Sequence, residues 1–130
     1  MLLLGLGLPA SVGAQIKLKS YPGYESKIMS LDIEGLHSPA LYFRSTTEGE
    51  RPLALFLHGA GGDRGGKIVN PHSEVAQKLS EQKSPCDVIQ PLSKGRWSPK
   101  ALDVLIELMI QKHAIDKDRI YILGGVNCVL

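Results

Sequence analysis

Short apolar runs alternate along this chain with segments of helical periodicity, and polar loops separate them. Pro52 to Leu57 is a continuous apolar run, and it is too short for a typical helix, so it predicts a strand buried on both faces. Two further strands are expected, from Asp87 to Gln90, which Pro91 closes, and from Arg119 to Leu123. Two short strands are expected before them, from Ile28 to Ile33 and from Ala40 to Phe43.

The segment from 70 to 84 predicts a modest amphipathic helix. Its apolar residues Val75, Ala76 and Leu79 fall at helical spacing. Pro71 stands where a first helical residue is expected, because proline has no N–H to lose at that position.

A second and stronger helix is expected from Ser98-Pro99, an N-cap followed by a first-turn proline, to about Ala114. Its polar positions recur every four residues, at Asp103, Glu107 and Gln111. Since almost all the other positions are apolar, we expect this helix to pack broadly against a sheet. A solvated stripe is where charges belong, so we do not interpret Asp103 and Glu107 as a catalytic acid and base.

The order strand, helix, strand, helix, strand predicts consecutive βαβ units, with a polar turn at Asp116 to Asp118 before the last strand. The chain has 130 residues, of which 43% are hydrophobic and 22% charged, and this composition is typical of one globular domain. We therefore expect an α/β fold with three layers and a mostly parallel sheet.

Residues 1–14 have the layout of a signal peptide. The apolar stretch Leu2 to Leu8 is followed by Pro9 and by small residues up to Ala14. This predicts export, to a secreted or periplasmic location, with residues 15–130 as the globular part. The apolar stretch is much shorter than the ~20 residues of a membrane span, so no span is expected.

Charge and ligand spacing exclude several classes of function. The formal net charge is only +2, and no run of basic residues interleaved with aromatics predicts nucleic-acid binding. The histidines and cysteines are scattered singly, without the close spacing of a zinc site, so neither a metal nor a cofactor is expected. They are His37, His58, His72, His113, Cys86 and Cys128.

Two glycine-rich segments formally fit nucleotide-binding patterns. Gly5 to Ala10 matches a dinucleotide loop, but Pro9 and the residues after it predict no helix behind it. Gly61 to Lys67 follows a buried strand and matches a P-loop, but Ile68 stands where a magnesium-binding hydroxyl is required. Pro71 also opposes a helix that begins at the lysine. A P-loop-like nucleotide-binding domain is therefore the less favoured interpretation.

A different set of motifs follows the same strand in order. These are His58-Gly59-Ala60-Gly61, Asp63-Arg64-Gly65, the segment Pro85 to Pro91, Trp97, Asp116, the segment Asp118 to Tyr121, and Gly124. From Leu41 to Gly124 the chain resembles the α/β-hydrolase superfamily. The resemblance is to its predicted-peptidase and esterase branch, which is related to prolyl oligopeptidases and includes secreted polyester, feruloyl and acetylxylan esterases.

The resemblance implies a role for the loop after the strand. Glycines let the backbone turn tightly and direct an N–H at the oxygen of a tetrahedral intermediate. By resemblance Ala60 is that oxyanion-hole donor, and His58, Gly59 and Gly61 form the supporting loop. His58 is then a loop-organising residue rather than the general base. The family's substrates are small esters or peptides.

The resemblance fails at the nucleophile elbow. The family pattern is G-x-S-x-G, whereas this chain has Gly124-Gly125-Val126-Asn127-Cys128. Val126 occupies the serine position, and Cys128 lacks the flanking glycines of a cysteine elbow, so no catalytic residue is assigned. His113 lies near a helix C-terminus, where a cation is favourable, and is not interpreted as the base.

From the missing serine we expect an incomplete hydrolase domain, truncated at the elbow and inactive alone. The alternative is a non-catalytic α/β binding scaffold. In the family's strand order, the strand that begins near Cys86 and the strand Arg119 to Leu123 flank the strand Leu53 to Leu57. Arg119 to Leu123 is interior in that order, but in a chain truncated at the elbow it becomes an edge strand that invites self-association. The same order places Cys86 and Cys128 too far apart for a disulfide.

Overall fold

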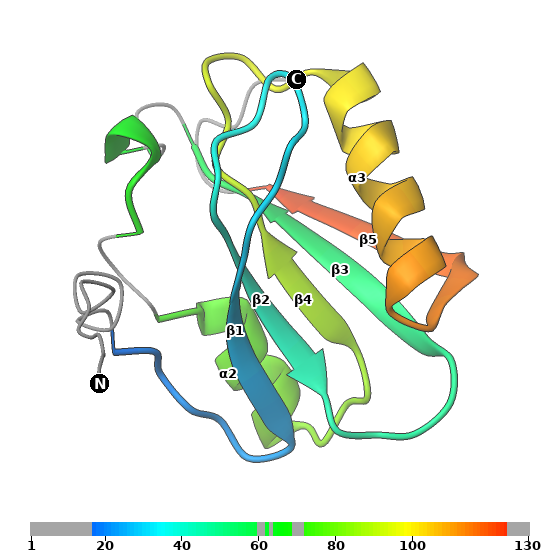
Figure 1. The fold of residues 1–130 in the computed structure, drawn as a ribbon. Helices are drawn as coiled ribbons and strands as arrows, with labels where there is room; N and C mark the ends of the chain where they lie inside the picture. The colour runs from blue at the N-terminus through cyan, green and yellow to red at the C-terminus, as the bar shows by residue number, and fades with distance from the viewer. Residues whose placement is uncertain (1–16, 60–61, 63, 69–71, 125–130) are drawn as a thin grey trace, which may run out of the picture.

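The computed structural model describes residues 17–59, 62, 64–68 and 72–124. One five-stranded sheet organises this part of the chain, in the order β1-β2-β4-β3-β5, as Figure 1 shows. Its strands are β1 (Tyr24–Met29), β2 (Ala40–Ser45), β3 (Arg51–Leu57), β4 (Asp87–Gln90) and β5 (Ile115–Gly124). The predicted buried strand is thus β3, which lies between β4 and β5.

The sheet is mixed, so the expectation of a mostly parallel sheet is wrong. Strand β3 pairs in parallel with β4 and with β5, as helical crossovers require. In contrast, β1 pairs antiparallel with β2, and β2 pairs antiparallel with β4. The first two strands are connected by loops rather than by helices, and loops impose no parallel direction.

The first strand lies earlier than expected, at Tyr24–Met29 rather than Ile28 to Ile33. Leu31 and Ile33 are nevertheless buried in the core. They enter it from a loop in which the Leu31 N–H donates to Ser38 Oγ at 2.9 Å. The alternating apolar residues therefore predicted a strand where the chain forms a loop after β1.

The helices are α2 (Glu74–Glu81), α3 (Pro99–Lys112) and a short 3-10 turn, η2 (Arg64–Gly66). Ser98 caps α3 as predicted, accepting from the Ala101 N–H. The predicted first helical residue, Pro71, lies outside the described residues, and α2 begins at Glu74. Ser73 is the N-cap of α2, and its hydroxyl accepts from the Ala76 N–H at 3.0 Å while donating to Gln90 Oε1 at 2.6 Å.

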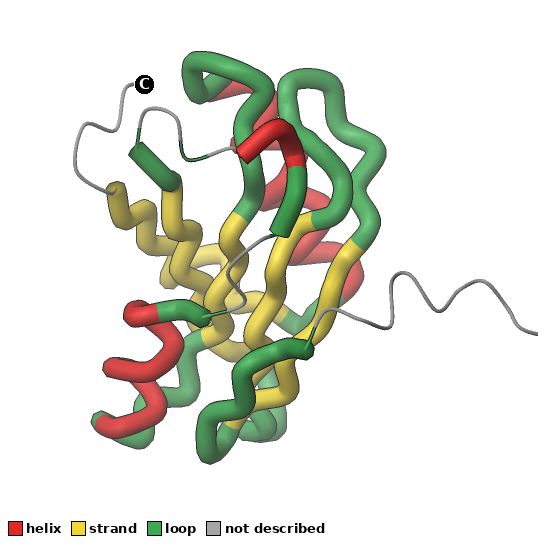
Figure 2. The backbone as a smooth tube through the Cα atoms, turned by 90° about the vertical axis from the view of Figure 1, so that its left-hand side faces the viewer, coloured by secondary structure: helices red, strands yellow, loops and turns green. Residues whose placement is uncertain are grey.

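The two helices cover opposite faces of the sheet. Leu53, Leu55 and Leu57 of β3 belong to one core cluster with α3, whereas Ala54 belongs to a second cluster with Ala76 of α2. This alternation is the two-residue period of a strand that is buried on both sides. Figures 1 and 2 show α3 on one face and α2 on the other.

Helix α3 packs through a narrower stripe than predicted. Leu105 and Met109 are fully buried, but Val104 is 47% exposed. Residues one position apart point about 100° apart on a helix, so one sheet face cannot cover them all.

The polar segment from Asp116 to Asp118 lies inside β5 rather than in a turn before it. Arg51 of β3 pairs with Ile115 of β5, and Leu53 pairs with Ile120. An advance of two residues along β3 thus corresponds to five along β5, so β5 bulges here. Asp116 accepts from the Asp118 N–H and pairs with Arg119 at 2.7 Å. The hydrogen bond from the Asp118 N–H, and then the one from Arg119, lower the pKa of Asp116.

Candidate functional site

The loops that follow β3 and β4 meet at the carboxyl ends of these parallel strands, where open α/β sheets bind their ligands. His58 follows β3 directly. Ser93 and Trp97 lie in the connection from β4 to α3, and both are buried.

His58 is held at both ring nitrogens. The Ser93 N–H donates to Nε2 at 3.0 Å, so Nε2 is the unprotonated nitrogen. The protonated Nδ1 then donates to the Gly59 carbonyl oxygen, at 2.8 Å. We infer this tautomer from the bonding pattern. With both nitrogens engaged by backbone groups, the imidazole links two loops.

Trp97 completes this arrangement from the other side. Trp97 is 4% exposed, and its ring packs against the His58 ring at a tilt of 49°, with centroids 4.7 Å apart. The indole Nε1–H donates to the His58 carbonyl oxygen at 3.1 Å. Trp97 therefore fixes both the ring and the backbone of the residue that begins the loop.

Gly62 lies close behind the imidazole. A Cβ at this position would stand 2.7 Å from the His58 Cβ, which is closer than such atoms approach. The Gly62 N–H donates to the Gly59 carbonyl oxygen at 3.0 Å. A glycine is thus required for the loop to fold back over His58.

Among the sequence-predicted site residues, His58 and Gly59 are therefore brought together with Ser93 and Trp97. Ala60 and Gly61 lie outside the described residues, as do the leader at residues 1–14, Val126 and Cys128. Ser93 had no sequence signal, because only the loop geometry turns its N–H toward an imidazole.

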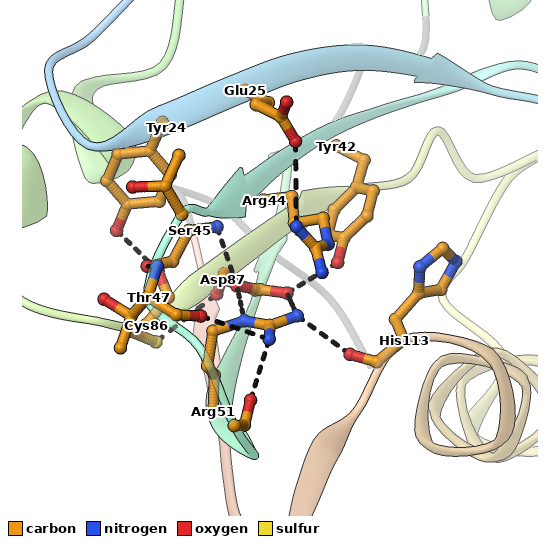
Figure 3. A network of polar contacts seen from close by, with 12 residues as sticks. Tyr24, Glu25, Tyr42, Arg44, Ser45, Thr47, Arg51, Cys86, Asp87 and His113 are labelled. Carbon is orange, nitrogen blue, oxygen red and sulfur yellow. Dashed lines mark hydrogen bonds and ion pairs between the residues drawn. The ribbon is translucent and has the colours of Figure 1, made fainter.

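A buried ion pair, absent from our sequence analysis, lies at the opposite, amino ends of β3 and β4 (Figure 3). Arg51 is 1% exposed and Asp87 0%. Arg51 donates from Nε to Asp87 Oδ1 at 2.9 Å and from Nη2 to Oδ2 at 3.2 Å. The carboxylate also accepts from Tyr42 Oη at 2.5 Å and from the Ser45 N–H at 2.8 Å.

The remaining donors of Arg51 bind main-chain carbonyls. These belong to Thr47 at 3.4 Å, Gly49 at 2.8 Å and His113 at 2.9 Å. Among the described residues, no buried side-chain nitrogen or oxygen lacks a partner. The network joins β2, β3, β4 and the end of α3, and its saturation marks it as structural rather than catalytic.

The network alters the ionisation of its neighbours. Burial, and then the hydrogen bond to Asp87, raise the pKa of Tyr42. His113 packs edge-on against the Tyr42 ring, with centroids 5.0 Å apart. Burial lowers the pKa of His113. The negative charge of Asp87 raises it, and nearby cations such as Lys27 lower it further. The lowered pKa favours the neutral imidazole, whereas the helix C-terminus by itself favours a cation.

The described residues do not form the geometry of a P-loop. Such a loop needs a helix that begins at its lysine, whereas the next α-helix after Lys67 begins at Glu74. In the described ranges, no cluster of three potential metal ligands is found. Within the same residues, no helix is long and apolar enough to cross a membrane.

Cys86, just before β4, is a free thiol that is 6% exposed. Its S–H donates to the Asp87 carbonyl oxygen at 3.3 Å. Burial, and then the Asp87 charge, raise its pKa from 9.0 to about 11, although Arg119 opposes the shift. The thiolate that reacts with electrophiles is therefore scarce near neutral pH.

We expect Cys86, in a Cys128→Ser variant, to react with a disulfide reagent at pH 8 about 100-fold slower in the fold than in urea. Because its folded pKa lies above the unfolded value, its contribution to stability is complete below pH 9 and is lost as the pH rises through about 11. Urea titrations against a Cys86→Ala/Cys128→Ser control isolate this loss. Equal rates in the two states would contradict the burial of the thiol.

Several solved esterase structures are similar to this chain. A structure from a study of two fungal esterases from Rhizomucor miehei matches 88% of it with a TM-score of 0.53 and 16% identity. An esterase of the bacterial hormone-sensitive lipase family covers 88% with a TM-score of 0.49 and 16% identity. A thermostable esterase from Pseudomonas putida covers 89% with a TM-score of 0.46 and 18% identity. No protein-family model and no curated protein matches.

The fold of the described residues is part of an α/β-hydrolase fold, like that of the Rhizomucor miehei esterase structure. The chain spans only 38% of the Rhizomucor miehei esterase and 37% of the hormone-sensitive-lipase-family enzyme. The predicted strand order around β3 is confirmed, with β4 and β5 on either side of it.

Proposed function

We propose that this chain is the N-terminal part of an exported serine hydrolase that acts on carboxyl esters. We further propose that its 130 residues do not catalyse hydrolysis alone. The observation that carries the proposal is β3 running into a loop held by His58, at the carboxyl edge of an esterase-like sheet.

In the proposed site the loop after β3 supplies the oxyanion hole. The Ala60 N–H is the donor, and Gly59 and Gly61 allow the turn. His58 acts through its tautomer: Nδ1–H binds the Gly59 carbonyl, and Nε2 binds the Ser93 N–H. This fixes the direction in which the chain leaves β3, and it leaves no ring nitrogen for proton transfer.

Esters are proposed rather than peptides because the similar structures are named as esterases. The complete enzyme is proposed to have three layers, with a serine at the elbow and an acid and a base that follow it in the chain. Val126 in the serine position supports inactivity of the chain as given.

Incubating the purified chain with p-nitrophenyl acetate tests the inactivity. We expect no turnover above that of the heat-denatured protein, because no serine nucleophile stands at the elbow. Turnover that a serine-directed phosphonate removes would contradict the proposal.

The coding DNA tests the other half of the proposal. Read in the two other frames past codon 125, it should encode Ser-x-Gly-Gly and then a long open frame with a later Asp and His. If neither frame does so and the chain binds ligands without hydrolysing them, the non-catalytic scaffold is the better description.

A further inference from the structure

A small hollow lies between the end of α3 and strands β1 and β2, at the edge of the sheet opposite β5. Its volume is about 260 Å³. One part of its wall is apolar and another part is basic. The apolar part includes Ile28, Met29 and Leu108, and the basic part consists of Lys27, Lys112 and His113. The hollow is thus separate from the candidate site at the carboxyl ends of β3 and β4.

A strand and a helix each place one lysine at this hollow. Lys27 stands opposite Tyr42 in the antiparallel pairing of β1 with β2, so both side chains lie on the same face of the sheet. That face is the one under α3, because Tyr42 and Met29 pack in the core cluster of that helix. Lys112 stands in the last turn of α3. Two ammonium groups therefore flank one apolar wall.

These lysines are the cations of this region that have no counter-ion. The two arginines nearby, Arg44 and Arg51, are each paired with a carboxylate (Figure 3). Neither Lys27 nor Lys112 forms an ion pair within the part of the chain that the structure describes. An excess of positive charge thus faces the hollow.

The end of α3 does not cancel this charge. Main-chain carbonyls at a helix C-terminus carry partial negative charge, which repels an anion. The carbonyl oxygen of His113, the C-cap residue, accepts a hydrogen bond from Arg51 Nη2 at 2.9 Å. Lys112 adds a positive charge to the same turn. The local field therefore remains favourable to an anion.

We propose that this hollow binds a small aliphatic carboxylate, with its head group between Lys27 and Lys112 and its chain against Ile28, Met29 and Leu108. Ammonium groups form charge-assisted hydrogen bonds with carboxylates. At ~30 Å³ for each water-sized group, the hollow holds roughly nine non-hydrogen atoms, and hexanoate is of this size. The site does not depend on the proposed hydrolase function.

NMR titrations of the 130-residue chain with matched ligands test the chemistry of the site. Both lysines are exposed, so we expect a Kd for hexanoate of about 1 mM. Butyrate should bind about fourfold more weakly for each methylene that it lacks. Hexanol lacks the charge and inorganic phosphate lacks the chain, so both should bind much more weakly than hexanoate. If either binds as tightly as hexanoate, the proposed ligand class is wrong.

Removing the two charges tests the position of the site. Lys27→Met/Lys112→Met should weaken hexanoate binding by about tenfold or more, because two charge-assisted hydrogen bonds are lost. Lys100→Met/Lys117→Met is the matched control. It removes the same charge from two exposed positions outside the hollow and should bind like the wild type. Equal affinities of the two double variants would overturn the proposal.

His113 provides a readout that needs no variant. The titratable and charged groups that face it from the sheet and from its own helix are Lys27, Tyr42, Arg44, Arg51, Asp87 and Lys112. Burial lowers the pKa of His113, and the surrounding cations lower it further against the charge of Asp87. A carboxylate bound in the hollow favours the charged imidazole, so it should raise this pKa. NMR pH titrations of the His113 ring should show the rise with saturating hexanoate and not with hexanol. An unchanged His113 pKa in saturating hexanoate would show that the carboxylate does not bind here.

Discussion

Replacing Asp87 with alanine is expected to lower the free energy of unfolding by about 3–5 kcal/mol, because it leaves the Arg51 guanidinium buried without its counter-ion. Arg51 is 1% exposed, so water cannot replace the lost carboxylate. Urea denaturation at neutral pH, followed by circular dichroism, measures the effect.

The exposed pair Arg44–Glu25 is the matched control. Arg44 Nη1 and Glu25 Oε1 lie 3.7 Å apart, and the two side chains are 35% and 55% exposed, respectively. Arg44→Ala should cost less than about 1 kcal/mol, since solvent screens such pairs. If Asp87→Ala cost no more than Arg44→Ala, the buried network would not hold the strands together as described.

The double variant Arg51→Met/Asp87→Leu separates the cost of leaving one buried charge unpaired from the net contribution of the ion pair to stability. Each single change leaves one uncompensated charge in the core, whereas the double change leaves none. The double variant should therefore be more stable than either single variant. A double variant that loses the sum of both single effects would show that the ion pair has no such coupling.

The parts of the fold that local patterns determine were predictable from the sequence. β3, β4 and α3 lie within two residues of their predicted bounds, because a buried strand and a capped helix each carry their own signal. The first strand was wrong because Leu31 and Ile33 fill the core from a loop. Burial periodicity reports the environment of a side chain and not the pairing of its backbone.

Strand direction and long-range polar contacts were not predictable in the same way. The antiparallel pairing of β2 with β4 joins residues such as Leu41 and Gln90, and no local pattern encodes that choice. The Arg51–Asp87 pair joins residues that each stand at the start of a buried apolar run. The pair could have been identified from one signal: residues of opposite charge stand at the start of two predicted strands that neighbour each other in the sheet.

The candidate site was predictable as a loop but not as a packed unit. The glycines after His58 indicated a tight turn, and the resemblance assigned Ala60 within it. The contacts that hold this turn come from Ser93 and Trp97, which lie in a different connection. Only the pairing of β3 with β4 brings the two connections together.

Trp97→Ala should therefore both destabilise the fold and release the candidate loop. We expect a loss of about 3–5 kcal/mol, because a buried aromatic side chain is removed and a cavity remains. The His58 ring then loses the aromatic ring that packs against it, and the His58 carbonyl loses its indole donor. Hydrogen exchange of the Ser93 amide, which donates to His58 Nε2, should accelerate beyond what the global loss of stability explains.

Trp97→Phe keeps an aromatic ring but no N–H, so it should cost less stability and leave the Ser93 amide better protected. If the Ser93 amide exchanges at the wild-type rate in Trp97→Ala, Trp97 does not hold His58 in place and the proposed support of the oxyanion loop fails.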